Sequence, residues 1–165
     1  MRETKRRKKK NPYIIPVMIA ALLALFLFGY IDDWSRDFTR NHAAISPEAT
    51  DESLRPLAST LSTADLVEAA RRAAGRIRTW EHIGDAAEGN TTLVLFERTS
   101  RIWRFKDDII IVIENLGTER MVSGKSASRI GIGDLGQNPR NLRRILAELA
   151  VVLEDDAPYA RPASD

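Results

Sequence analysis

The feature that most constrains this chain is an uncharged, apolar run of twenty residues at positions 12–31, PYIIPVMIAALLALFLFGYI. At about 1.5 Å of rise per residue, a helix of this length reaches roughly 30 Å, the thickness of the hydrocarbon core of a bilayer. Tyr13 and Tyr30 lie near its ends, where aromatic side chains favour the membrane interface. The run therefore predicts one transmembrane helix and attachment to a membrane through residues 12–31.

Two other interpretations of the run fit less well. A buried core helix of this length would not be apolar on every face. A cleaved secretory signal requires small residues at the exit of its apolar run. Here the chain leaves through bulky residues, FGYIDDW at positions 28–34, so we expect an uncleaved signal anchor.

The charges differ on the two sides of the run. Residues 1–10, MRETKRRKKK, hold seven Lys or Arg and one Glu, whereas Asp32, Asp33 and Asp37 follow the run. Basic residues before a span predict a cytoplasmic stub at residues 1–11 and a remainder outside the cytoplasm. We expect a single-pass protein of the plasma (inner) membrane with a periplasmic or otherwise extracytoplasmic domain. The stub holds the basic excess and leaves the remainder mildly acidic, so nucleic acid is not an expected partner.

Residues 32–60 show neither a strand nor a helix period and contain Pro47, Pro56 and many Ser, Thr and Asp, which is typical of a tether. The chain has no cysteine and two histidines. This composition excludes disulfides, cysteine zinc sites and a thiol nucleophile, and it leaves too few histidines for a histidine-rich metal centre. We expect no metal site and no cofactor.

A folded domain is predicted at residues 61–153. Ser62 and Asp65 form a helix-capping pattern, and apolar residues at helical spacing follow to residue 79. The remaining elements are expected strands at residues 81–87, 91–98, 108–114 and 119–128, and a second helix from Asn138-Pro139 to near Leu153. These elements predict an α+β fold with about four antiparallel strands and two flanking helices. We expect the tail at 154–165 to be disordered.

Two of the predicted strands are apolar on both faces. The residues are Leu93 to Phe96 and Ile109 to Ile113, whereas a sheet with one wet face would alternate with polar residues. Either a strongly curved sheet closes over its own side chains, or the second face meets a partner, a lipid or an apolar ligand.

The polar residues that merit attention surround the last two strands and the start of the second helix. If the strands pair through a turn at Asn115, residues 107 and 108 lie close to residues 126–129. Arg129 is then expected to form a bidentate ion pair with an aspartate. The candidate binding residues are Arg104, Asp107, Asp108, Ser126, Ser128, Arg129, Asp134 and Asn138.

Two interpretations of this set remain open. The residues form an ion-pair and capping network that fixes the loop before the second helix. Alternatively, Arg129 and the backbone N–H groups at Asn138 form a shallow site for an anionic headgroup or a carboxylate.

The run TTLVLFERTSRIWRFKDDIIIVI at positions 91–113, followed by SGKSASRIGIGDLGQNPRNLRRILAEL, resembles the domain of unknown function family 1499. The resemblance covers about residues 62–152. It is most specific at Ser126 to Gly131 and at Asp134 to Asn138, with a second block at Trp103 to Asp108. The resemblance implies a small domain, often in envelope or membrane-attached proteins, with no established activity.

Three catalytic or nucleotide motifs fail. Gly131, Gly133 and Gly136 fit G-x-G-x-x-G, but no further strand follows the second helix to complete a nucleotide-binding unit. Gly124-Lys125-Ser126 lacks the earlier glycine of a phosphate-binding loop. A relay of Ser126 or Ser128 with His82 and Asp108 has no supporting motif.

With no catalytic pattern, we expect a membrane-anchored, non-enzymatic domain outside the cytoplasm that binds an envelope protein or an apolar, lipid-like ligand. The alternative is a small hydrolase or other enzyme that uses the loop of Arg129 and Asp134.

Overall fold

The computed structural model describes residues 13–31 and 33–156, in two compact units that divide at residue 32. The first unit holds α1 (Ile14–Tyr30), an uncharged helix of 17 residues with large apolar side chains exposed along its length. Among the described helices, none is both long enough and apolar enough to cross a bilayer. The predicted stub at residues 1–11 lies outside the described part of the chain.

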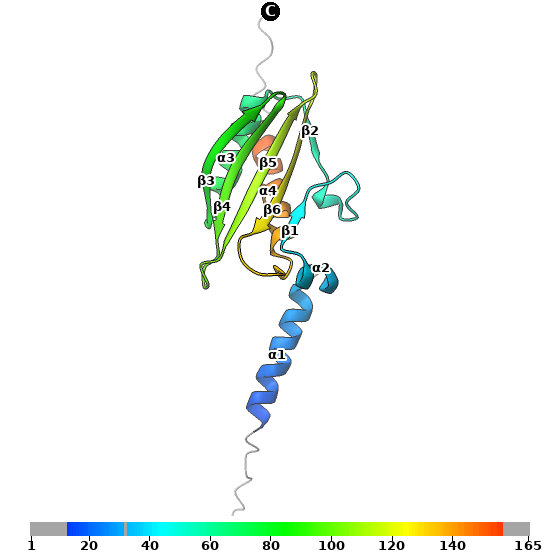
Figure 1. Ribbon diagram of the computed structural model, residues 1–165, viewed down its shortest axis with the longest axis vertical. Helices are drawn as coiled ribbons and strands as arrows, with labels where there is room; N and C mark the ends of the chain where they lie inside the picture. The colour runs from blue at the N-terminus through cyan, green and yellow to red at the C-terminus, as the bar shows by residue number, and fades with distance from the viewer. Residues whose placement is uncertain (1–12, 32, 157–165) are drawn as a thin grey trace, which may run out of the picture. The chain divides into compact units, whose positions relative to one another are not determined.

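The second unit is an antiparallel sheet with helices on one face, so the predicted α+β class is confirmed (Figure 1). The sheet has six strands rather than about four, in the order β1-β6-β5-β4-β3, with β2 also pairing with β6. The strands are β1 (His42–Ala44), β2 (Leu57–Ser59), β3 (Trp80–Glu88), β4 (Thr91–Thr99), β5 (Lys106–Asn115) and β6 (Arg120–Ser128). The helices over the sheet are α3 (Thr63–Gly75) and α4 (Gln137–Asp156).

The core lies between the helices and one face of the sheet, here called the inner face. Alternate strand residues point to this face, because successive side chains of a strand lie on opposite sides. The buried side chains from the sheet are Val94, Phe96, Ile109, Ile111, Ile113 and Val122, and they meet the apolar stripes of α3 and α4.

The predicted start of α3 is confirmed. Ser62 accepts a hydrogen bond from the backbone N–H of Asp65 over 3.1 Å and donates its hydroxyl to the Asp65 carboxylate over 2.6 Å. The helix ends at Gly75, before the predicted end at residue 79, and the chain turns directly into β3.

The prediction of a tether at residues 32–60 is wrong for the residues described there. This segment contains α2 (Trp34–Thr39), β1, the 3-10 helix η1 (Glu52–Leu54) and β2. Its two strands pair with β6, and Ile45 and Leu54 are buried in the core. Each strand has three residues, too few for a period to appear in the sequence, and each forms because the edge of β6 offers unpaired backbone groups.

The other face of the sheet, here called the outer face, carries the second set of apolar side chains. Leu93, Leu95, Ile110 and Val112 are half-buried there, opposite the face that α3 and α4 cover.

At the edge of the sheet, the register of β3 shifts between His82 and Gly84, which marks a β-bulge. At the C-terminal end of the second unit, α4 continues to Asp156, so residues 154–156 are helical rather than disordered as predicted. Residues 157–165 of the predicted tail lie outside the described residues.

Candidate functional site

The predicted polar residues occupy both faces of the sheet. Asp107 and Asp108 are consecutive on β5, so their side chains point to the inner and outer faces respectively. Asp107 pairs with Ser128 in the strand register, as the turn at Asn115 predicted. The candidates therefore form an inner cluster and an outer cluster.

Asp107 is the centre of the inner cluster and is almost fully buried. Its carboxylate accepts hydrogen bonds from Arg98 Nη1 over 2.6 Å, from Ser128 Oγ over 2.7 Å and from Asn141 Nδ2 over 3.1 Å. A buried carboxylate is costly unless charge and hydrogen bonds compensate it. Three donors, one of them a cation, supply that compensation and join three strands to α4.

Asn138 links the inner cluster to the start of the second unit. Its carbonyl oxygen accepts from Ser126 Oγ over 2.6 Å, and its Nδ2 donates to the backbone oxygen of Asn41 over 2.6 Å and to Ser128 Oγ over 3.1 Å. The side chain of Asn138 therefore holds the residue before β1 against the end of β6. The oxygen and the nitrogen of this side chain are both engaged, so Asn138 contributes to the stability of the fold.

The outer cluster is a set of ion pairs around Arg129. Arg129 donates to both oxygens of Asp108, from Nε over 3.0 Å and from Nη2 over 2.6 Å, so the predicted bidentate pair is present. Its Nη1 atom lies 2.8 Å from Oε2 of Glu97, and Lys106 Nζ lies 2.6 Å from Oε1 of the same carboxylate. The Lys106 hydrogen bond and the nearby Arg129 charge hold the pKa of Glu97 below its usual range, against the effect of burial.

Asp134, rather than Asn138, caps α4. Its two carboxylate oxygens accept from the backbone N–H groups of Gly136, over 2.9 Å, and Asn138, over 2.7 Å. The helix begins at Gln137, so Asn138 lies inside its first turn. Because the Asp134 carboxylate already accepts from the N–H groups of Gly136 and Asn138, an anion at this helix start would have to displace a carboxylate of this chain.

The glycines of the G-x-G-x-x-G match allow the loop before α4 to pack on α2. A Cβ atom on Gly133 would lie 2.5 Å from the backbone oxygen of Asp37. Gly136 has a φ of +75°, and a Cβ atom there would lie 2.5 Å from Oδ2 of Asp37, a buried side chain. The spacing that resembles a nucleotide motif thus reflects close backbone packing against Asp37.

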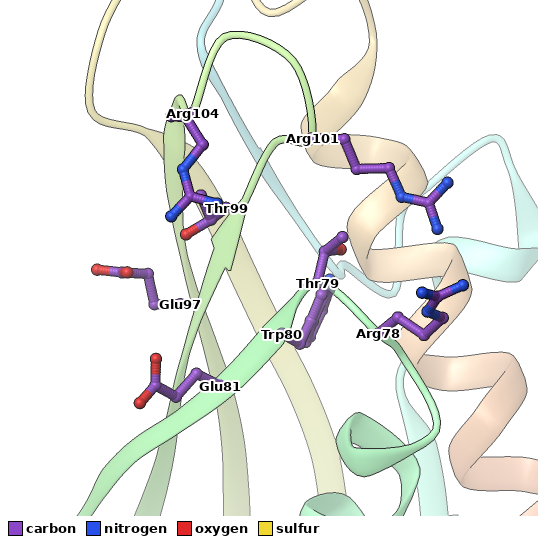
Figure 2. Close-up of a pocket in the computed structure, with 8 residues that line it drawn as sticks. All are labelled: Arg78, Thr79, Trp80, Glu81, Glu97, Thr99, Arg101 and Arg104. Atoms are coloured by element: carbon purple, nitrogen blue, oxygen red, sulfur yellow. The ribbon is translucent and has the colours of Figure 1, made fainter.

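Arg104 lies apart from both clusters, in the turn between β4 and β5, with a φ of 57°. This residue lines a pocket of about 330 Å³ at the ends of β3 and β4. Figure 2 shows the guanidinium groups of Arg78 and Arg101 on one side of Trp80, with Glu81 and Glu97 on the other side. The lining residues are Arg78, Thr79, Trp80, Glu81, Glu97, Thr99, Arg101 and Arg104.

The three arginines of the pocket differ from the other arginines near it. Within residues 13–31 and 33–156, neither an ion pair nor a hydrogen bond engages the guanidinium groups of Arg78, Arg101 or Arg104. Arg98 and Arg129, by contrast, are held by Asp107 and by Asp108 with Glu97. The free cations of this region therefore gather at the pocket.

The serine, histidine and aspartate side chains considered for a catalytic relay interact with other residues and not with one another. His82 Nε2 lies 2.8 Å from Asp85 Oδ1, Asp108 pairs with Arg129, and Ser126 is bonded to Asn138. In the described part of the chain, no group of three or more His, Cys, Asp or Glu side chains is placed to hold a metal ion.

A family model described as "Protein of unknown function (DUF1499)" matches residues 33–149. The chain belongs to the DUF1499 family. The match begins at the start of the second unit, well before residue 62, in agreement with the folding of residues 33–60 onto β6. No curated protein and no solved structure matches the chain.

Sequence reasoning missed several partners in this DUF1499 domain. Asn141 lies on the buried side of α4, where a polar residue within the apolar stripe signals a buried hydrogen bond. Arg98 follows Val94 and Phe96 at a spacing of two residues on β4, so the strand period also indicated that its side chain points to the inner face. Nothing in the sequence indicated Asn41 or Arg78, because each meets its neighbours only through the pairing of distant segments.

Proposed function

We propose that this chain is a membrane-attached, extracytoplasmic binding protein whose arginine pocket takes an anionic group of a lipid-like ligand. Attachment is supported by the uncharged run at residues 12–31 and by the exposed apolar side chains on all sides of α1. An apolar helix with no polar stripe is stable in lipid and unfavourable in water.

The charge distribution supports the direction of insertion. Seven basic residues precede the apolar run within positions 1–10, and acidic residues follow it at Asp32, Asp33 and Asp37. By the positive-inside rule, the stub remains in the cytoplasm and the DUF1499 domain lies outside it. A reporter enzyme fused after residue 60 tests this topology. A reporter that is active only in the cytoplasm would contradict it.

The observation that carries the proposed ligand class is the arginine pair, Arg78 and Arg101, beside Trp80. The two guanidinium groups share one pocket and have no acidic partner within the described residues. Arginine presents a fork of N–H donors that matches phosphate and carboxylate oxygens. The indole of Trp80 adds an apolar wall, so the pocket suits an anionic group attached to an apolar or ring-shaped body.

The binding test uses the full chain in nonionic detergent micelles and dihexanoyl phosphatidic acid as the probe. We expect Arg78→Gln/Arg101→Gln to weaken binding about tenfold or more, because each charged hydrogen bond is worth about 1.5–3 kcal/mol. The matched control is Arg55→Gln/Arg144→Gln, which removes the same charge from residues that do not line the pocket. Equal binding by the two double variants would rule out the arginine pair as the site.

The outer face supports a second candidate, which is a protein partner. Leu93, Leu95, Ile110 and Val112 form a half-buried apolar strip opposite the helices. If a partner covers this strip, Ile110→Lys should abolish a complex larger than the free chain in gently solubilised membranes. Leu116→Lys, at an exposed apolar residue in the turn after β5, is the control. A complex that survives Ile110→Lys would exclude the strip as its interface.

A further inference from the structure

The turn between β4 and β5, residues 100–105, carries a cluster of exposed apolar side chains, here called the hairpin tip. Ile102 is 81% exposed and Trp103 is 74% exposed, and Phe105 is exposed beside them. Removing such side chains from water is favourable. Three of them on one turn indicate that the turn meets an apolar environment outside the chain.

A second exposed apolar turn lies at the same end of the sheet. The loop between β6 and α4 presents Ile130 and Ile132, the latter 82% exposed. The two turns are neighbours because Thr99 pairs with Lys106, Asp107 pairs with Ser128, and Arg129 donates its backbone N–H to the oxygen of Lys106 over 3.0 Å. Figure 1 shows both turns at the end of the sheet where α2 lies.

The cations at this end complement an anionic surface. Arg101 and Arg104 lie within the hairpin tip, and Arg78 lines the adjoining pocket. Within the described residues none of the three is engaged by an acidic side chain. Tryptophan and aliphatic side chains flanked by arginines are typical of surfaces that enter the headgroup layer, where cations are attracted to anionic lipids.

The second unit begins at this same end of the sheet. The backbone oxygen of Asp37 on α2 accepts from the N–H of Leu135, and Asn41 Nδ2 donates to the oxygen of Gly131 over 3.0 Å. The second unit thus begins, at Asp33, beside the loop that carries Ile130 and Ile132. In the sequence, the apolar run ends at residue 31, two positions before Asp33.

We infer that the hairpin tip and the loop of Ile130 and Ile132 form one surface that docks onto the headgroup layer of an anionic bilayer. This inference rests on the proposed membrane attachment and adds to it an orientation, in which this end of the sheet faces the lipid. The turn after β5, with Leu116, lies at the opposite end of the sheet and faces away. The arginine pocket then opens at the height of the lipid headgroups.

The absence of cysteine allows a clean test on the full chain. Ile102→Cys is labelled with the environment-sensitive dye NBD and reconstituted into phosphatidylcholine vesicles with or without phosphatidylglycerol. Leu116→Cys, also an exposed apolar residue at 56%, is the matched control. We expect a blue-shifted emission at position 102, quenched by brominated lipid and stronger with phosphatidylglycerol, and a solvent-like emission at position 116.

The failures of the two proposals are distinguishable. If the chain resists alkaline extraction from the vesicles while both labels report water, the attachment holds and the docking surface is wrong. If alkaline extraction releases the chain, the attachment itself is wrong and the inference falls with it. A label at position 102 that is protected from water but not quenched by brominated lipid would mean that protein covers the tip, which overturns a lipid surface.

A separate variant tests how the arginines contribute to docking on anionic lipid. Arg101→Gln/Arg104→Gln should remove the additional quenching that phosphatidylglycerol produces at position 102, whereas Arg55→Gln/Arg144→Gln should retain it. An unchanged dependence on phosphatidylglycerol in the first variant would contradict the role of these arginines.

Discussion

Asn141 on α4 donates a hydrogen bond from its Nδ2 atom to Oδ2 of Asp107 on β5 over 3.1 Å, with both side chains buried. The bond joins the second residue of β5 to the first turns of the last helix. Since Asp107 also holds Arg98 and Ser128, one carboxylate connects β4, β5, β6 and α4.

Removing the charge of Asp107 should lower the free energy of unfolding. Asp107→Asn leaves Arg98 half-buried without its anion and replaces an acceptor by a donor, so we expect a loss of about 3 kcal/mol in the free energy of unfolding. Urea denaturation of the full chain in nonionic detergent, followed by circular dichroism, measures the loss. The neighbouring Asp108→Asn breaks an exposed ion pair and should cost under about 1 kcal/mol. Similar losses in the two variants would show that Asp107 is not the centre of the network.

The cap of α4 gives a second prediction. Asp134→Ala removes the acceptor for the N–H groups of Gly136 and Asn138, and we expect a loss of about 1 kcal/mol. Asp134→Ser, which restores a capping oxygen, should recover much of it. Thermal unfolding of the three chains gives the comparison. A neutral Asp134→Ala would contradict the capping role and reopen the loop as a functional site.

Gly133 tests the contact between the loop and α2. A Cβ atom there would lie 2.5 Å from the backbone oxygen of Asp37. Only a movement of the loop can relieve a steric clash with backbone at this distance. We expect Gly133→Ala to cost about 1–3 kcal/mol. Gly75→Ala, where a Cβ atom would meet no heavy atom within 4 Å, is the control and should be neutral or slightly stabilising. Equal stability of both variants would mean that the loop does not rest on α2.

Glu97 predicts how stability depends on pH. The pKa of Glu97 is lowered in the folded protein, first by the hydrogen bond from Lys106 and then by the charges of Lys106 and Arg129, with burial acting in the opposite direction. A carboxyl whose pKa falls on folding adds stability above its unfolded pKa of about 4.3, and this stability is lost as the pH falls through the folded pKa.

Urea titrations between neutral pH and the acid limb should therefore show a smaller loss of stability below about pH 4.3 in Glu97→Gln than in the unaltered chain. The variant should be the less stable of the two at neutral pH. If the free energy of unfolding falls equally in the two chains as the pH is lowered, Glu97 does not contribute to the pH dependence of stability.

The long strands and both helices over the sheet follow from local sequence, because β-branched runs and capping residues act within a few residues of one another. Ser62 begins α3, and the turn after Asn115 brings Asp107 to Ser128, as the spacing predicted. Local patterns did not reveal β1 and β2, since three-residue strands exist only where β6 provides partners. The same holds for Asn41, whose backbone oxygen receives Asn138 from 97 residues away.

The sequence predicted which candidate residues pair with each other, but not that the sheet separates them onto its two faces. The bidentate contact of Arg129 with an aspartate was expected, whereas the separation of Asp107 from Asp108 by the sheet itself depends on which face α3 and α4 cover. The arginine pocket depends on the approach of Thr79 to Thr99, which carry a backbone hydrogen bond of 3.0 Å. No sequence period encodes that approach.

The bulge between His82 and Gly84 bears on how copies of this domain avoid one another. Among the described strands, β3 ends the strand order, with β4 on one side and no strand paired on the other. An extra residue in β3 twists the strand and breaks the regular row of donors and acceptors that a neighbouring molecule would need for strand addition. Glu81 and Glu88 add charged side chains to the same edge strand, so fibrillar growth from this edge is disfavoured by both shape and charge.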